Sequence, residues 1–425
     1  MVLERMLSDK ALILRVDIAD AQFLYEYLRQ EEVDEKAVEK VCAPFEGWWK
    51  AFNDLNDAMR HNVFIMIRDA FDLRNDSQDY QRVSPEVMMQ LVPRIWKYLS
   101  LKMGIEPGMG IEPGKEGGFF YELTKSGDNK CANEFRRLCT SALPSTLIPQ
   151  RYLWLRHIIK LYNEHICDRR GRSRRNILDI ADFGGSLGDG CPFALCNDGG
   201  HNLDISCGDS GLSEVLAIVT SEEDLRRPET AVTVFDVQGK DVDPVWVRAS
   251  FYDKYDSSAL EMISNLADNS VRHPVFTPPD FVRANLTREQ DKSYRYRFDL
   301  GVASMMLYMM ERDDRERALN TMLEMMGDMS VLTIIDANGV IGVGEDGRVN
   351  GGAEGTHLSQ LFEDGGVSMH CIVKRVEVAG DEFEIFNMGS FYSYDGNTPD
   401  ACMSFKPNIE SWRDFENIIS GNRVR

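Results

Sequence analysis

A glycine-rich turn after an apolar run is the part of this chain whose residue types and spacing could do chemistry. The run over residues 177–181 has the composition of a buried parallel strand, and Asp182 ends it. Glycines then follow at Gly184, Gly185, Gly188 and Gly190. Because glycine lacks a side chain, such a backbone can approach a ligand closely. The pattern predicts a strand that ends in a ligand-binding turn.

Counted from Asp182, the turn has the pattern Asp-x-Gly-x-Ser-x-Gly through Gly184, Ser186 and Gly188. It resembles motif I of class I S-adenosylmethionine-dependent methyltransferases, which has glycine where this chain has Ser186. The resemblance implies S-adenosylmethionine as the cofactor, bound by Asp182, Gly184, Gly185, Ser186 and Gly188. The other interpretation of the same residues is an ordinary strand-to-helix loop of an α/β protein.

The motif can also be aligned so that its acidic residue falls on Asp179 and not on Asp182. Ala181 and Phe183 would then stand at the first two glycine positions. A phenylalanine side chain there would block the close approach of a ligand, so we place the acid at Asp182.

The resemblance also implies an acid at the end of the second strand, which binds the ribose. Two residues compete for this role: Asp204, and Asp236 at the end of the apolar run over residues 231–235. Strand propensity favours Asp236. Parallel neighbours, however, need a crossover, and residues 210–225 supply one between the two acids. We therefore expect Asp204 on the ribose and Asp236 on the adenine, with an insertion over residues 190–229 as the alternative.

Residues 298–309 begin with Phe-Asp-Leu and resemble the fourth strand of the family and the turn after it. The resemblance implies that Ala303 lies against the cofactor, and that Ser304 and Tyr308 are catalytic residues. A helical pattern over residues 315–326 and a buried strand over residues 331–336 follow in the expected order.

Basic residues gather over residues 151–175, directly before the turn. Eight Lys or Arg stand there against two acids, in a chain whose net charge of −21 would repel nucleic acid. The segment is either a solvated loop or a contact for a phosphate-bearing substrate, through Arg172, Arg174 and Arg175.

The element Tyr-Leu-Trp-Leu-Arg over residues 152–156 and the pair Asp204 and Ile205 are similar to parts of messenger-RNA cap guanine-N7 methyltransferases. This similarity implies capped RNA as the methyl acceptor. A small molecule or a protein is the alternative methyl acceptor. The alternative to an enzyme is a binding or scaffold protein that keeps the methyltransferase fold and has lost the activity.

These observations predict an α/β, Rossmann-like fold of the class I methyltransferase type. Its sheet would be mostly parallel and seven-stranded, with a C-terminal antiparallel hairpin over residues 367–388, and an α-helical region would precede it. We expect a helical region over residues 1–102, which could bind a protein partner, a Gly/Pro-rich linker over 103–130, and a methyltransferase-like domain over 150–425 with an insertion at about 245–295. The exact repeat Met-Gly-Ile-Glu-Pro-Gly over residues 103–114 motivates the linker.

Composition narrows the class of protein further. The chain has 425 residues and nine scattered cysteines, with no Cys-x-x-Cys pair. This predicts reduced thiols and neither structural zinc nor disulfides. It has no apolar run of about 18 residues, so we expect an intracellular, cytoplasmic protein without membrane contact, the nucleus being an alternative.

Overall fold

A computed structural model describes much of the chain and divides it into two compact units. The first comprises Met1–Pro144 with Arg248–Asp253, and the second comprises Ser145–Val247 with Lys254–Arg425. The described residues are 42, 45–77, 80–83, 85–105, 117–127, 129–143, 149–167, 177–186, 188, 190–196, 205–207, 225–226, 229–237, 243–251, 260, 264, 279–288, 290–343, 349–352, 366–378, 380–392 and 403–421.

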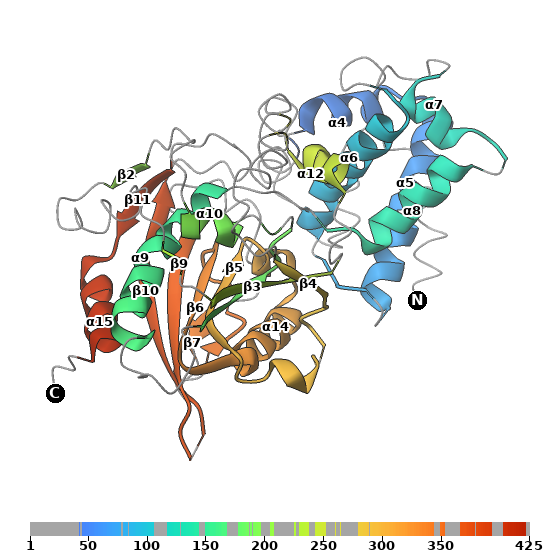
Figure 1. The fold of residues 1–425 in the computed structure, drawn as a ribbon. Helices are drawn as coiled ribbons and strands as arrows, with labels where there is room; N and C mark the ends of the chain where they lie inside the picture. The colour runs from blue at the N-terminus through green and yellow to red at the C-terminus, as the bar shows by residue number, and fades with distance from the viewer. Residues whose placement is uncertain are drawn as a thin grey trace. The chain divides into compact units, whose positions relative to one another are not determined.

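The first unit is helical where it is described, as the sequence predicts (Figure 1). Its helices are α4 (Glu46–Asn53), α5 (Asp57–Asp76), α6 (Pro85–Lys102), α7 (Phe119–Thr124) and α8 (Lys130–Ser141). Asn56 and Asn129 begin α5 and α8, since their side chains accept the backbone N–H groups of Met59 and Ala132. Helix α7 lies inside the segment expected to be a linker and buries Phe119 and Phe120. The linker prediction is therefore corrected for residues 119–124, whose aromatic side chains need a core.

An aromatic cluster fills the core of this unit. Trp96 packs at its centre, with ring centroids 5.1 to 6.5 Å from those of its neighbours. These neighbours are Trp48, Trp49, Phe52 and Phe120. Two buried cations bind the segment Arg248–Asp253, which belongs to the first unit. Arg94 donates to the Ser250 carbonyl, and Lys97 donates to the Phe251 carbonyl.

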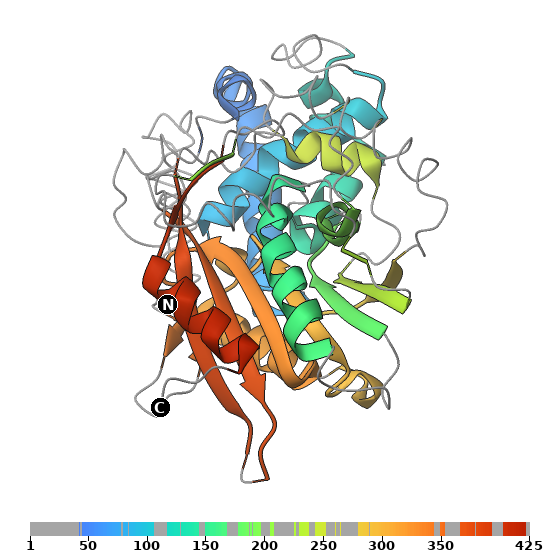
Figure 2. The ribbon, with the colours of Figure 1, turned by 60° about the vertical axis from the view of Figure 1, so that its left-hand side comes forward.

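The second unit is built on one mixed sheet (Figure 2). In the described part of the chain nine strands pair in the order β2-β11-β10-β9-β6-β5-β1-β3-β4. Their bounds are β1 (Ile177–Phe183), β2 (Ile205–Cys207), β3 (Glu229–Asp236), β4 (Asp280–Arg283), β5 (Phe298–Ser304), β6 (Met326–Ala337), β9 (Val367–Arg375), β10 (Glu382–Tyr392) and β11 (Met403–Pro407). Five of the eight strand pairs are parallel. Strands β9 and β10 form the predicted antiparallel pair, and β11 and β2 extend that edge beyond the seven strands expected.

The prediction for the second parallel strand is wrong. β3 pairs with β1, whereas β2 pairs with β11 at the opposite edge of the sheet. The alternative with an insertion after Gly190 therefore describes the chain. Strand β4 pairs in parallel with β3 and lies inside the insertion expected at about residues 245–295. A crossover of helical length does not decide which strands become neighbours, because that depends on pairing with distant residues.

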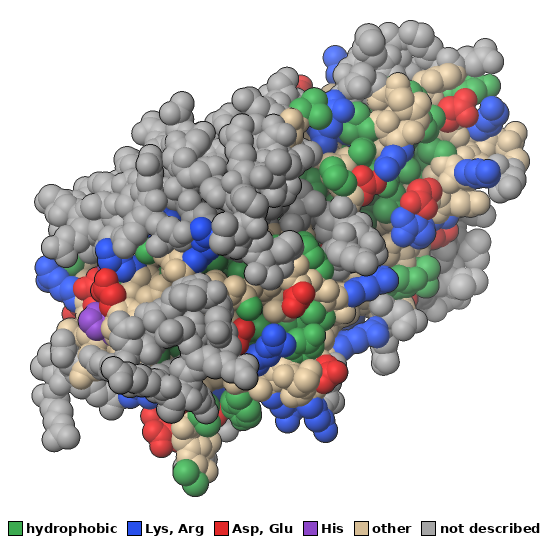
Figure 3. All heavy atoms as spheres, viewed as in Figure 1, with side chains coloured by type: hydrophobic (Ala, Val, Ile, Leu, Met, Phe, Trp, Pro, Cys, Tyr) green, Lys and Arg blue, Asp and Glu red, His purple; other side chains and the backbone are tan. Residues whose placement is uncertain are grey.

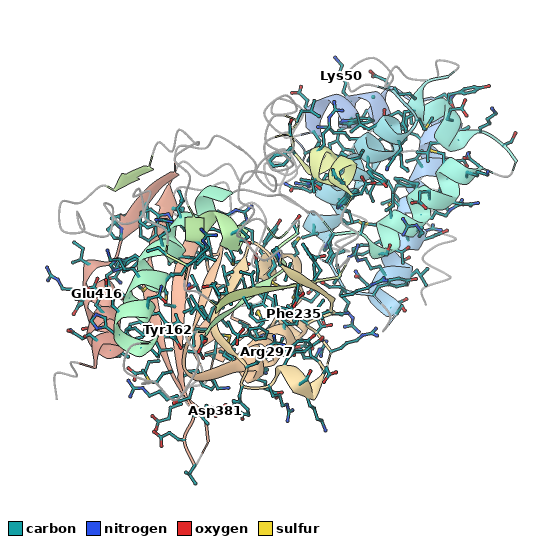
Figure 4. All side chains as sticks on the ribbon, viewed as in Figure 1. Lys50, Tyr162, Phe235, Arg297, Asp381 and Glu416 are labelled. Carbon is teal, nitrogen blue, oxygen red and sulfur yellow. The ribbon has the colours of Figure 1, made fainter. Side chains whose placement is uncertain are left out.

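Along the chain, helices precede, separate and follow the strands of the sheet. The 3₁₀-helix η2 (Pro149–Trp154) and α9 (Leu155–Tyr162) precede β1, and α10 (Gly190–Cys196) follows the glycine turn. Helix α14 (Arg312–Met325) connects β5 to β6, and α15 (Ile409–Ser420) ends the described chain. Nε2 of His157 on α9 lies within hydrogen-bond distance, 2.9 Å, of Oε1 of Glu416 on α15, so these two helices lie side by side (Figure 4).

Candidate functional site

The glycine turn lies at the point where the order of the parallel strands reverses. β1 has β3 on one side and β5 on the other, and Phe183 is in register with Phe235 and with Ala303. The residues that follow these three strands therefore meet at one edge of the sheet. In open α/β sheets, ligands bind outside the carboxyl ends of the strands at such a switch point.

The turn itself uses backbone conformations that favour glycine. Gly184 and Gly188 have φ of +73° and +79°, and Ser186 has φ of +53°. The Gly184 N–H donates to the Phe235 carbonyl at 2.7 Å, and the Gly188 N–H donates to the Gly185 carbonyl at 2.8 Å. Ser186 thus adopts the left-handed conformation that is uncommon for a residue with a side chain. Where the family has glycine, this chain keeps the glycine-like backbone with a serine.

Asp182 lies beneath the turn and is fully buried. The Tyr152 hydroxyl donates to its Oδ1 at 3.1 Å. Burial first, and then the charge of Asp182, raises the pKa of Tyr152 and that of the Cys191 thiol well above their ordinary values. Both groups therefore keep their protons at neutral pH. A Cβ on Gly185 would lie 2.5 Å from the carboxyl carbon of Asp182, so the turn closes over this carboxylate only with glycine there.

Replacing Tyr152 by phenylalanine is expected to lower the free energy of unfolding by about 1 to 3 kcal/mol, because a buried carboxylate loses a donor. If the turn binds a ligand, the same change lowers the affinity for it. Tyr162→Phe is the matched control, since the Tyr162 hydroxyl donates to Asp299 at the same 3.1 Å, away from the turn (Figure 4). Urea unfolding and ligand titration of both variants check this. Equal loss of ligand affinity in both would contradict a role of Asp182 in shaping the turn.

Asp236 ends β3 and connects directly to the turn. Its Oδ2 accepts the backbone N–H of Ser186 at 3.3 Å, and the side chain is only half-buried. Asp204, the residue expected on the ribose, lies outside the described residues. The strand that begins one residue later, β2, is at the far edge of the sheet from β3 and β4. The geometry therefore favours Asp236 over Asp204 as the acid at this site.

The end of β5 supplies the other side of the edge. Ala303 is buried beside Phe183, and the Ser304 Oγ accepts from Nη1 of Arg151 at 3.3 Å. Tyr308 follows in the 3₁₀-helix η8 (Leu307–Met309) and is half-buried. The structure thus brings Ala303 and Ser304 to the edge that carries the turn, with Tyr308 in the connection after them.

Arg151 also belongs to this edge, although its place in the basic segment predicts a solvated loop or a contact for phosphate. Arg151 is only 3% exposed, and Arg156 is fully buried with Nη1 donating to the Ala194 carbonyl at 2.6 Å. These two cations are part of the fold and do not form a solvated patch. Arg172, Arg174 and Arg175 lie outside the described residues.

The residues that the structure describes contain neither a group of metal ligands nor a membrane-spanning helix. Within them, no three His, Cys, Asp or Glu side chains are grouped so that they could hold a metal ion. Also within them, every helix is too short or too polar to cross a membrane.

Comparisons with known proteins found weak similarities to solved structures. No family model and no curated protein sequence matches the chain. Among solved structures, it is similar to a trans-methyltransferase, CalH, in complex with SAH, at 11% identity over 78% of this chain and 73% of that protein, with a TM-score of 0.26. It is also similar to an S-adenosylmethionine-dependent methyltransferase from Clostridium acetobutylicum, at 11% identity over 60% and 79%, with a TM-score of 0.22.

A third similar structure is that of a cyclase. It is the [4+2]-cyclase SpnF, at 13% identity over 43% of this chain, with a TM-score of 0.22. The chain spans 44% of the length of that protein. Because all three scores are low, the assignment of function rests on the topology and the site of the chain itself.

Proposed function

We propose that this protein binds S-adenosylmethionine and transfers its methyl group to an acceptor. One observation carries the proposal: a turn with left-handed residues at Gly184, Ser186 and Gly188 follows the central strand, and an acid on the neighbouring strand is hydrogen-bonded to it. A nucleoside with two vicinal hydroxyls needs such an acid, and a backbone without side chains lets the ligand approach.

The residues at this edge fit the chemical groups of the cofactor. Asp236 supplies a carboxylate for the ribose hydroxyls, next to the turn. Arg151 supplies a buried cation at the same edge, which suits the carboxylate of the methionyl group. Cβ atoms at Gly184 and Gly188 would lie 3.2 Å from Met306 and 2.7 Å from Phe281, so the turn packs closely against these two side chains and its shape depends on glycine.

The sulfonium supplies an activated methyl group, so the protein has a modest chemical task. It must bind the cofactor, align the acceptor with the methyl group and keep water away. Ser304 is the last residue of β5 and Tyr308 follows in η8, and we assign to both the orientation of the acceptor.

Calorimetric titration of the full chain with S-adenosylmethionine, S-adenosylhomocysteine and NAD tests the proposal. We expect one site for each of the first two ligands and no binding of NAD, because the turn lacks the dinucleotide pattern Gly-x-Gly-x-x-Gly. If neither S-adenosyl compound binds, the proposal is wrong, and the protein is better described as a methyltransferase-like fold without the activity. Binding of NAD alone would replace the proposal with dinucleotide chemistry.

RNA remains our proposal for a phosphate-bearing acceptor, through Arg172, Arg174 and Arg175. Two of the eight basic residues over residues 151–175 are buried, so at most six can reach phosphates. On the face shown in Figure 3, basic and acidic side chains are intermixed.

If RNA is the acceptor, binding of capped RNA is expected to weaken steeply as salt rises, because each neutralised phosphate releases counterions. Changing Arg172, Arg174 and Arg175 to Glu is expected to flatten this dependence and to leave cofactor affinity unchanged. Fluorescence anisotropy between about 50 and 200 mM salt measures both effects. Without salt-sensitive binding in the unaltered protein, a small molecule or a protein replaces RNA as the proposed acceptor.

A further inference from the structure

Asp336 is a buried carboxylate near the end of β6 that four backbone N–H groups contact. Its side chain is 1% exposed. Oδ2 accepts from Met306 at 2.9 Å and from Leu307 at 2.7 Å, while Oδ1 accepts from Tyr308 at 3.2 Å and from Ala337 at 2.8 Å. Three of these donors are consecutive residues of the connection after β5. Successive N–H groups that converge in this way form a binding site for an anion, which the chain itself supplies.

The connection over residues 305–310 is held in one conformation. The Met305 N–H donates to the Ile335 carbonyl at 2.7 Å, and Met305 has φ of +55°. A residue with a side chain adopts this φ only where its surroundings enforce it. Met306 then packs on the glycine turn, since its Sδ lies 3.2 Å from the position that a Cβ on Gly184 would occupy. A direct path of contacts therefore leads from Asp336 through Met306 to Gly184.

We propose that the ionised Asp336 is a positioning residue that holds residues 305–310 against the glycine turn, in the arrangement that binds the cofactor. Asp336 itself is buried beneath the connection and acts through backbone groups. The inference rests on the proposed function, because cofactor affinity is the property that Asp336 controls.

Charged and titratable groups lie near Asp336 in the part of the chain that the structure describes. Arg315 on α14 is a cation close enough for the charge of Asp336 to oppose the lowering of the Arg315 pKa by burial. Tyr308 on η8 donates only its backbone N–H in the contact given above. On the adjacent strand β9, Ser368 is in register with Asp336, and His370 contacts the Ser368 hydroxyl. Burial lowers the pKa of His370 to about 4, so His370 stays neutral above pH 5.

The carboxyl group is expected to titrate near neutral pH. Burial raises the pKa of Asp336 to about 6, and the four backbone N–H groups oppose this increase. The folded state therefore binds this proton more tightly than the unfolded chain does. The contribution of Asp336 to folding stability is largest at low pH and falls as pH rises from about 4 to about 6. Cofactor affinity is expected to change in the opposite direction, because only the ionised carboxylate can accept from all four donors.

Titration with S-adenosylhomocysteine at pH 7.5, 6.5 and 5.5 tests the proposal in the unaltered full chain and two variants. In Asp336→Asn, an amide NH₂ group, which is a hydrogen-bond donor, replaces a carboxylate oxygen and faces backbone N–H groups that are also donors. Asp328→Asn is the matched control, because Asp328 lies on the same strand and its carboxylate accepts the Val376 N–H at 3.0 Å, near the other end of β6. For the unaltered protein we expect affinity to fall about fourfold between pH 7.5 and 5.5, because a carboxyl group with a pKa of about 6 is about three-quarters protonated at pH 5.5. Asp336→Asn should bind weakly with little dependence on pH, and Asp328→Asn should follow the unaltered protein.

Unchanged affinity and pH dependence in Asp336→Asn would overturn the proposal, as would equal losses in both variants. If circular dichroism shows that Asp336→Asn does not fold, the pH dependence of the unaltered protein decides: constant affinity across this range overturns the positioning role. No binding to the unaltered protein at any pH would instead remove the proposed function, and the inference with it. The two failures are therefore distinguishable.

Discussion

Gly188→Ala is expected to weaken the binding of S-adenosylmethionine by about tenfold or more, because overpacking of a closely packed site costs about 1 to 3 kcal/mol. An added Cβ would lie 2.7 Å from Cζ of Phe281 on β4 and 3.1 Å from Cγ2 of Val234 on β3. Either the turn or the ring of Phe281 must move. The turn would then lose the conformation in which its backbone approaches the ligand.

Gly117→Ala is the matched control for this change. Gly117 has φ of +80°, against +79° for Gly188, but a Cβ there meets nothing within 4 Å. Both variants therefore carry the cost of about 1 to 2 kcal/mol for a left-handed alanine, while only Gly188→Ala adds a steric overlap. Calorimetric titration should show a large loss of affinity in Gly188→Ala and no change in Gly117→Ala. Equal affinity in the two variants would mean that the cofactor does not depend on the shape of the turn.

Asp236→Ala is expected to weaken cofactor binding by about 1.5 to 3 kcal/mol, as for the loss of charge-assisted hydrogen bonds to hydroxyl groups. Asp236 ends the strand next to β1 and is already hydrogen-bonded to Ser186 in the turn. Asp204→Ala is expected to leave the affinity unchanged, since the adjacent strand β2 pairs with β11 at the other edge of the sheet.

Titration of the two variants under identical conditions separates these roles. Adenosine is a useful second ligand, because it carries the ribose hydroxyls without the methionyl group. A loss of affinity for both ligands in Asp236→Ala would assign the ribose contact to this residue. A loss of affinity only in Asp204→Ala would assign the ribose contact to Asp204, as expected from the sequence, and would contradict the assignment to Asp236.

Sequence reasoning was most successful where local patterns determine structure. The apolar run before Asp182 forms β1, and the Phe-Asp-Leu opening at Phe298 begins β5. Both strands are buried between neighbours, which suits their largely apolar composition, and β5 is also expected from the resemblance of its opening to the fourth strand of the family. The positive φ angles at Gly184 and Gly188 also follow from residue type, because glycine adopts them without steric cost.

Sequence reasoning failed where distant residues decide the outcome. A three-residue strand such as β2 carries too little pattern to show that it pairs with β11, almost two hundred residues later. The burial of Arg151 depends in the same way on Ser304, which it contacts across the site. Asp336 was counted only as the end of a strand, since nothing in its neighbourhood along the chain indicates the three N–H groups of residues 306–308.

The structure of the full chain in complex with S-adenosylhomocysteine tests the central claim most directly. We predict that the ligand lies at the carboxyl ends of β1, β3 and β5, with its ribose hydroxyls on the Asp236 carboxylate and its methionyl group near the turn at Gly184–Gly188. Binding of the ligand at the edge formed by β2 and β11, or a turn that remains free of ligand when the protein is saturated, would contradict the account.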